Sequence, residues 1–126
     1  MSAIRSPIRS QLADVPAYIT RDGSSIRELM HPAVHGNANQ SLAEARIPPG
    51  GSTRLHRHQV SEELYHILSG SALMTLGEET FAIVAGDTVL IPPSTAHCLR
   101  NPGEQVLSLL CCCAPAYRHD DTEILD

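Results

Sequence analysis

From Ser41 onward, the sequence consists of short, partly apolar runs separated by closely spaced glycine and proline residues. The runs are SLAEARI, TRLHRH, ELYHIL, ALMTL, TFAIV, TVLI, AHCLR and QVLSLLCC, and the breaks between them include PPGG, SGS, AGD, PPST and NPGE. Runs of about 4–8 residues bounded by turn signals are typical of strands in an antiparallel sandwich or barrel. No stretch has the length and the 3.6-residue periodicity of a helix. We therefore expect an all-β fold.

The chain of 126 residues has the size of one compact domain. Residues 1–40 are broken by prolines and glycines, so we expect them to form an N-terminal arm with short strands that belongs to the same domain. Residues 41–115 are expected to form the barrel core. The acidic, polar residues 116–126 form a tail that packs over the barrel or frays.

Composition argues against two classes of partner. The net charge of -5 opposes contact with phosphate backbones, and 3% aromatic residues cannot build a base-stacking platform, so we expect no nucleic acid partner. The N-terminus has no apolar run of the kind a signal peptide needs. The most apolar stretch, 106–116, is far shorter than the roughly 20 residues that span a bilayer, so we expect no membrane segment.

The four cysteines are Cys98 and the run Cys111, Cys112 and Cys113. This arrangement differs from the spaced pairs of a secreted disulfide scaffold, so we expect the protein to be located in the reducing cytoplasm. In a strand, Cys111 and Cys113 face one way and Cys112 the other, which makes it hard for one metal to collect all three thiolates. We favour a packing role over a redox or zinc role, because free cysteine is a common small core residue.

Seven histidines are many for a chain of this length. His56 and His58 are two residues apart, so in a strand they point to the same face, with their Cα atoms roughly 6.6 Å apart. Two imidazoles at this spacing can converge on one metal ion. Glu62 and Glu63 follow in the next run and can bring a carboxylate to the pair. His97, after the turn IPPSTA, can supply a third imidazole.

These residues resemble the first characteristic motif of the cupin superfamily. Gly50 is followed by five residues, the tripeptide HRH (56–58), four residues, Glu63, six residues and Gly70. A later stretch resembles the second motif of the family. It consists of Gly86, five residues, PPS (92–94), two residues, His97, three residues and Asn101. Ser94 departs from the usual glycine, which puts the local turn conformation in question rather than the ligand set.

Resemblance to cupins implies a double-stranded β-helix, a small jelly-roll barrel with one divalent transition metal inside. Carried over by position, the metal ligands are His56, His58, Glu63 and His97. Glu62 is a weaker candidate, because the six-residue spacing to Gly70 fits Glu63. The mixed donor set suits Fe, Mn, Ni, Co, Zn or Cu and does not choose among them.

The remaining histidines and the neighbouring strands are assigned by alternation. In the strand from Glu63, the side chains of Tyr65 and Ile67 share the metal face, which makes Tyr65 a candidate catalytic residue or a barrel-filling one. His66 faces the other way and is not expected to be a ligand. Surface roles are expected for the histidines outside any ligand spacing, which are His31, His35 and His119. In SLAEARI, the small residues Ala43 and Ala45 are expected to face inward, with Glu44 and Arg46 outside.

Four protein ligands leave two positions of an octahedron open. The leading hypothesis is therefore a metal-dependent enzyme acting on a small oxygen-rich or carbonyl metabolite, with dioxygenase, isomerase and decarboxylase chemistry all open. The alternative is a non-catalytic protein that binds a sugar or an organic acid through the metal. A regulatory domain ranks last, because no helix-turn-helix pattern fits. A homodimer is expected from the resemblance.

Overall fold

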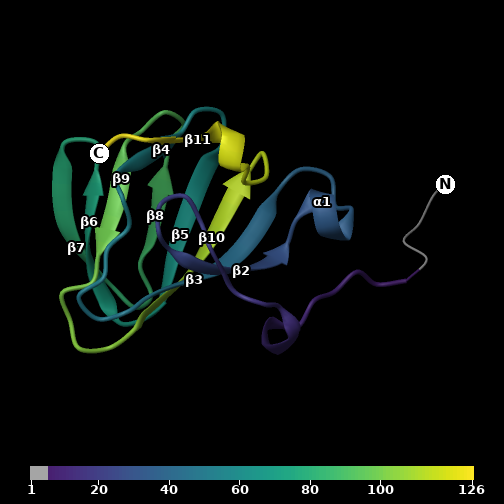
Figure 1. Ribbon diagram of the computed structural model, residues 1–126, viewed down its shortest axis with the longest axis horizontal. Helices are drawn as coiled ribbons and strands as arrows, with labels where there is room; N and C mark the ends of the chain where they lie inside the picture. Colours follow the sequence, from purple (N-terminus) through teal and green to yellow (C-terminus); the bar gives the residue numbers. More distant parts are fainter. Residues whose placement is uncertain (1–5) are drawn as a thin grey trace.

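The computed structural model describes residues 6–126 and consists of two antiparallel sheets packed face to face (Figure 1). In this range the strands are β1 (Tyr18–Ile19), β2 (Ser25–Met30), β3 (Ser41–Ile47), β4 (His56–His58), β5 (Glu62–Ser69), β6 (Ser71–Leu76), β7 (Glu79–Val84), β8 (Thr88–Ile91), β9 (His97–Arg100), β10 (Leu107–Ala114) and β11 (Thr122–Ile124). The short helices are η1 (Leu12–Asp14), α1 (Pro32–His35) and η2 (His119–Asp121). The expected all-β fold is confirmed.

Both ends of the chain add strands to the sandwich. One sheet has the order β1-β2-β3-β10-β5-β8, and the other has the order β11-β4-β9-β6-β7. The β1–β2 hairpin extends the first sheet through the pairing of β2 with β3. The tail strand β11 pairs with β4 in the second sheet. The segment after residue 115 therefore lies beside the strand that carries His56 and His58. The segment before residue 41 belongs to the sheet across from that strand.

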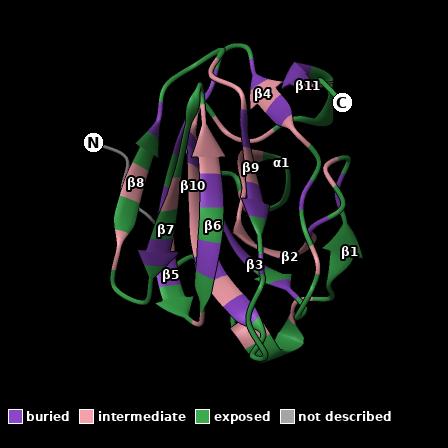
Figure 2. Cartoon of the chain, turned by 90° about the vertical axis from the view of Figure 1, so that its left-hand side faces the viewer, coloured by how far each residue is buried: buried purple, intermediate pink, exposed green. Residues whose placement is uncertain are grey.

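Alternation along the strands decides which side chains enter the space between the sheets. In β5, Glu63, Tyr65 and Ile67 are buried, whereas their neighbours face outward, as the period of two predicts. Figure 2 shows the same alternation of buried and exposed residues along β6. Glu44 of β3 lies on the outer face and is nevertheless buried, because two arginines, Arg27 and Arg46, pair with its carboxylate.

The apolar core is built from aliphatic side chains of both sheets. The largest members with less than 2% exposure are Ile67, Met74, Ile91, Leu99, Leu107 and Leu109. Burial of each such side chain stabilises the fold by about 1.5–3 kcal/mol relative to leaving it exposed. The core thus fixes the distance and orientation of the two sheets, and with them the positions of the polar residues that lie between the sheets.

The turn before His97 keeps a glycine-like conformation although it carries a serine. Ser94 has φ +63°, and among the described residues it is the non-glycine residue with positive φ. Its backbone N–H donates to the carbonyl of His58 at 2.7 Å. This bond ties the turn to the end of β4. The departure at Ser94 therefore leaves the local path of the chain intact.

Asn101, the last residue of the second motif, closes a loop and does not contact the histidines. Asn101 is 1% exposed, and its Nδ2 donates to the carbonyls of Ile47 and Gln105. Its backbone carbonyl accepts from the N–H of Gly50, the first residue of the first motif. The two motifs thus meet at their outer ends.

Candidate metal centre

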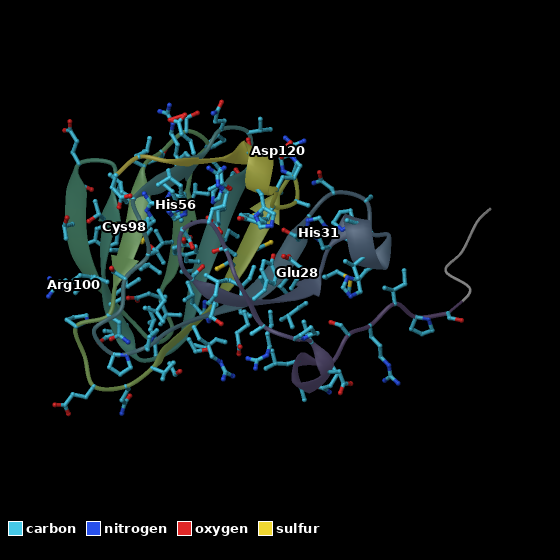
Figure 3. All side chains as sticks on the ribbon, in the orientation of Figure 1. Glu28, His31, His56, Cys98, Arg100 and Asp120 are labelled. Atoms are coloured by element: carbon cyan, nitrogen blue, oxygen red, sulfur yellow. The ribbon has the colours of Figure 1, made fainter. Side chains whose placement is uncertain are left out.

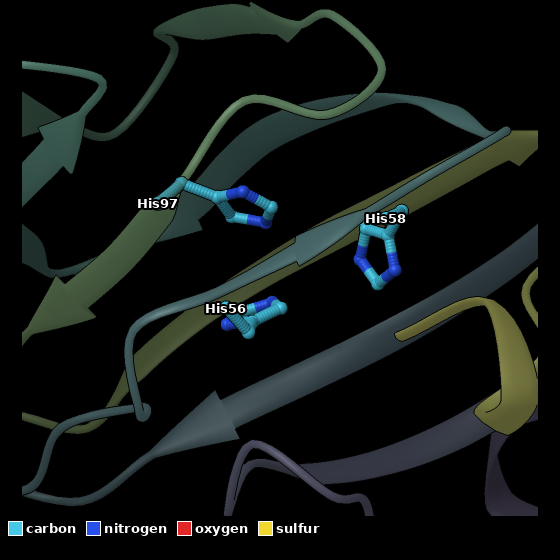
Figure 4. Close-up of side chains that lie close together, drawn as sticks. All are labelled: His56, His58 and His97. Carbon is cyan, nitrogen blue, oxygen red and sulfur yellow. The ribbon is translucent and has the colours of Figure 1, made fainter. Parts of the chain in front are cut away.

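Two neighbouring strands bring three histidines together between the sheets (Figure 4). His56 and His58 both face inward because they are two residues apart in β4, and both are buried. β9 pairs with β4 in the register His56 to His97, which puts the third imidazole on the same face. One ring nitrogen of each histidine lies within 4.8 Å of those of the other two. The structure thus brings together the three predicted histidines.

Hydrogen bonds at Nδ1 orient all three rings. The Nδ1 atoms of His56 and His97 lie 2.7 and 2.9 Å from the carbonyl oxygens of Arg54 and Thr95, which can only accept. His58 Nδ1 lies 3.1 Å from the Thr122 hydroxyl, which already donates to a backbone carbonyl and is therefore free to accept. All three rings thus carry their proton on Nδ1 and turn Nε2 toward the centre, as metal-binding histidines do.

Glu63 approaches two of the three histidines from the opposite sheet, whereas the donor atoms that all lie within 4.8 Å of one another belong to the histidines. Its Oε1 lies 3.2 Å from His58 Nε2 and 3.4 Å from His97 Nε2. Burial alone would raise the pKa of Glu63, but His58 and His97 in their protonated form donate to its carboxylate and hold the pKa at about 2. The Cys113 thiol, 3.4 Å away, donates to the other carboxylate oxygen. An ionised carboxylate thus faces the histidine nitrogens.

The donor atoms fit a metal ion and are poorly satisfied by one another. Glu63 Oε1 and His97 Nε2 are buried and have no hydrogen-bond partner among the described residues. Two lone pairs at 3.4 Å repel unless a cation lies between them. With metal–ligand bonds of about 2.1 Å, adjacent ligand atoms are about 3.0 Å apart in an octahedron and about 3.4 Å apart in a tetrahedron. The separations of Glu63 Oε1 from His58 Nε2 and His97 Nε2, 3.2 and 3.4 Å, fall in this range.

The other predicted candidates are distributed as alternation requires. Glu62 is exposed on the outer face of β5, away from the centre. His66, also on that face, contacts the Thr88 hydroxyl. Tyr65 is 4% exposed and faces inward, with its ring centroid 5.9 Å from that of His97. Burial raises the pKa of the Tyr65 phenol well above its ordinary value, so the phenol stays protonated and can donate.

The cysteine run divides between the two faces of β10. Cys111 and Cys113 line the interior, whereas Cys112 pairs across with Leu64 on the outer face. All four cysteines are free thiols. The predicted alternation is therefore present, and one thiol of the run touches a candidate metal ligand.

A small cavity lies beside the histidines. Its wall is apolar where Ile26, Ala43, Ala45 and Leu109 line it, and polar toward Glu63. The free volume of the cavity is about 40 Å³, enough for a few water molecules or one small ligand. The inward-facing alanines leave this room. In Figure 3, His56 lies between the two sheets, with Glu28 toward the N-terminal strands.

Two residues of this region carried no signal of a site in the sequence. Thr122 of β11 holds His58, and Asp22 of the β1–β2 turn has its Oδ2 3.2 Å from His56 Nε2. Asp22 is 34 positions from His56, and Thr122 is 64 positions from His58, so neither belongs to a local pattern. The dipeptide Asp22-Gly23 signals a turn, which the structure contains.

The geometry defines a jelly-roll protein with a candidate metal site between its sheets. A family model described as Cupin domain matches residues 43–113, more than half of the chain. The chain therefore belongs to the cupin family.

The similar proteins include relatives of known and unknown role. The "Uncharacterized protein MJ1618" of Methanocaldococcus jannaschii is 50% identical over 119 residues, which cover 94% of this chain and 95% of that protein. The oxalate-binding protein of Thermotoga maritima is 31% identical over 94 residues, covering 71% of this chain and 77% of that protein. The oxalate decarboxylase of Lactobacillus farciminis, solved as a formate complex, superposes with a TM-score of 0.82 at 26% identity. It is aligned over 97% of this chain and 37% of the decarboxylase.

Within residues 6–126, no helix is long and apolar enough to cross a bilayer.

Proposed function

We propose that His56, His58, Glu63 and His97 bind one divalent transition-metal ion, and that the chain is an enzyme acting on a small oxygen-rich or carbonyl metabolite. The observation that carries the proposal is the buried pair Glu63 Oε1 and His97 Nε2, 3.4 Å apart and without hydrogen-bond partners among the described residues. A bound ion would supply Lewis acidity and hold two substrate oxygens at adjacent positions. Fe, Mn, Ni, Co, Zn and Cu all suit the donor set.

The chain's own residues define what can enter. The aliphatic side of the cavity favours a compact substrate, because the free space is small. Tyr65, buried beside His97, donates a hydrogen bond to a substrate oxygen as a candidate catalytic residue. Small dicarboxylates and 2-oxo acids combine two chelating oxygens with this size. Decarboxylase, isomerase and dioxygenase chemistry all begin from such chelation.

A non-catalytic binding protein is the second candidate. The similarity to the oxalate-binding protein of Thermotoga maritima favours it, because that relative is named for binding. Calorimetry with oxalate and with 2-oxo acids, followed by product analysis, separates the two candidates. Product formation supports the enzyme. Tight binding without any product, for every compound tested, supports the binding protein.

Elemental analysis of protein purified without added metal tests the centre itself. We expect about one transition-metal ion per chain, lost in His97→Ala and retained in His66→Ala, the same substitution on the outer face of β5. Wild-type protein that neither contains nor takes up such a metal would contradict the proposal. Equal metal content in the two variants would do so as well.

We also propose a homodimer formed through the outer face of the six-stranded sheet. Leu64, Leu68 and Leu90 are 40–51% exposed there, and Leu64 is paired with Leu90 across β5 and β8. Neighbouring exposed leucines on a regular sheet face favour burial against a partner surface. The four free thiols support a reducing, cytoplasmic location.

A further inference from the structure

Asp22 lies in a turn whose position is fixed from several sides. The turn joins β1 to β2, and it closes with the Thr20 N–H donating to the Ser24 carbonyl at 2.9 Å. Gly23 has φ +91°, a conformation that suits glycine. The carbonyl of Asp22 accepts from the Arg54 N–H at 2.8 Å, next to the strand that carries the first two histidines. The turn therefore cannot move without breaking contacts to the second sheet.

The Asp22 carboxylate is also fixed, and only one of its oxygens is used by the turn. Oδ1 accepts from the Thr20 hydroxyl at 2.6 Å, the Ser24 hydroxyl at 2.7 Å and the Ser24 N–H at 2.9 Å. Oδ2 points into the cavity and lies 3.2 Å from His56 Nε2. The side chain is 13% exposed. A carboxylate oxygen that the turn does not use thus faces one of the candidate metal-binding nitrogens.

The contact between these two atoms needs a cation. His56 Nδ1 donates to the Arg54 carbonyl, so in the neutral ring Nε2 carries a lone pair. Carboxylate oxygens are acceptors as well, and two acceptors at 3.2 Å repel. The same conflict exists between Glu63 Oε1 and the Nε2 atoms of His58 and His97. A cation beside each contact removes the repulsion there.

We propose that Asp22 is a second carboxylate ligand of the metal centre, supplied by the N-terminal hairpin. The inference rests on the metal centre proposed above. The 3.2 Å separation from His56 Nε2 falls in the range of about 3.0–3.4 Å expected between adjacent ligand atoms. Two carboxylates neutralise the charge of a divalent ion. Asp22 occupies one of the two positions that the other four ligands leave open, and a substrate that chelates through two oxygens displaces it.

The substitution Asp22→Asn tests this role, because it preserves size while it removes the charge. Asp87→Asn is the matched control. Asp87 also caps a turn, because its Oδ2 accepts from the Val84 N–H. It directly precedes β8, whose opposite end carries Ile91, the residue paired with Glu63. Calorimetric titration of the metal-free proteins with Mn²⁺ and Co²⁺, against a competing chelator, gives the affinities. The visible spectrum of the Co²⁺ form reports the ligands directly.

We expect Asp22→Asn to weaken Mn²⁺ and Co²⁺ binding at least tenfold and to change the Co²⁺ spectrum, with both properties unchanged in the control. The metal-free variant should unfold at the same denaturant concentration as wild type or a higher one, because a repulsive contact is gone. If the variant does not fold, Thr20→Val serves instead, since it removes one donor to Oδ1 and retains the carboxylate. We expect it to weaken metal binding by a smaller factor.

An unchanged metal affinity and Co²⁺ spectrum in Asp22→Asn would overturn the inference and leave the four-ligand centre standing. Equal losses of stability with and without metal would also overturn it, because they would make Asp22 a turn-stabilising residue only. Wild-type protein that binds neither Mn²⁺ nor Co²⁺ would overturn the inference together with the metal centre.

Discussion

Thr122 offers a sharp test of how the histidines are held. It is 4% exposed, its hydroxyl lies 3.1 Å from His58 Nδ1, and it donates to the Arg118 carbonyl at 3.0 Å. Thr122→Val keeps the shape of the side chain and removes the hydroxyl. Thr122→Ser keeps the hydroxyl and removes a methyl group, so it is the matched control.

The expected loss of stability follows from the group left without a partner. A buried polar atom without a hydrogen bond costs about 1–3 kcal/mol, and His58 Nδ1 would be such an atom in either tautomer. A loss of about 2 kcal/mol, with an unfolding entropy of about 2.1 cal/mol/K per residue, lowers Tm by about 8 °C. Metal affinity should fall about 10- to 100-fold, because the ring loses the contact that orients Nε2.

Differential scanning calorimetry and Mn²⁺ titration of the two Thr122 variants measure these effects. The serine variant should bind Mn²⁺ as wild type does, although its lost methyl group costs some stability. If the valine variant binds Mn²⁺ as tightly as the serine variant does, the Thr122 hydroxyl does not orient His58, and the reasoning about the tautomer fails.

Further predictions concern the strained turn, the outer face and the thiols. Ser94→Gly removes a φ of +63° from a non-glycine residue and should raise the free energy of unfolding by up to about 1 kcal/mol in chemical denaturation; a clear loss would show that the serine is not strained. Leu64→Glu with Leu90→Glu should convert the proposed dimer to a monomer in analytical ultracentrifugation, and a wild-type monomer would refute the interface. Iodoacetamide should label Cys98 before Cys113 in the folded protein, because Cys113 is 2% exposed and burial raises the pKa of its thiol. Mass spectrometry of the digested protein distinguishes the two sites, and equal labelling would contradict the burial.

Alternation made part of the site predictable. His56 and His58 had to share a face once TRLHRH was expected to be a strand, and Glu63 had to share the face of Tyr65. The turn signals at glycine and proline separated the strands correctly, because backbone restrictions act over a few residues. Glu44 shows the limit of the same reasoning. Alternation put it on the outer face, but its burial depends on Arg27 of β2, whose position a local pattern does not specify.

The sequence by itself determined the all-β class, the position of the turns and the inward face of each strand that carries a histidine or Glu63. These properties follow from interactions between residues close in the chain. Only the tertiary structure decided that Thr122 holds His58 and that Asp22 faces His56. Pairing between strands and packing between sheets set those distances, and they join segments separated by tens of residues. The two ends of the chain therefore became part of the site only when the sandwich closed around it.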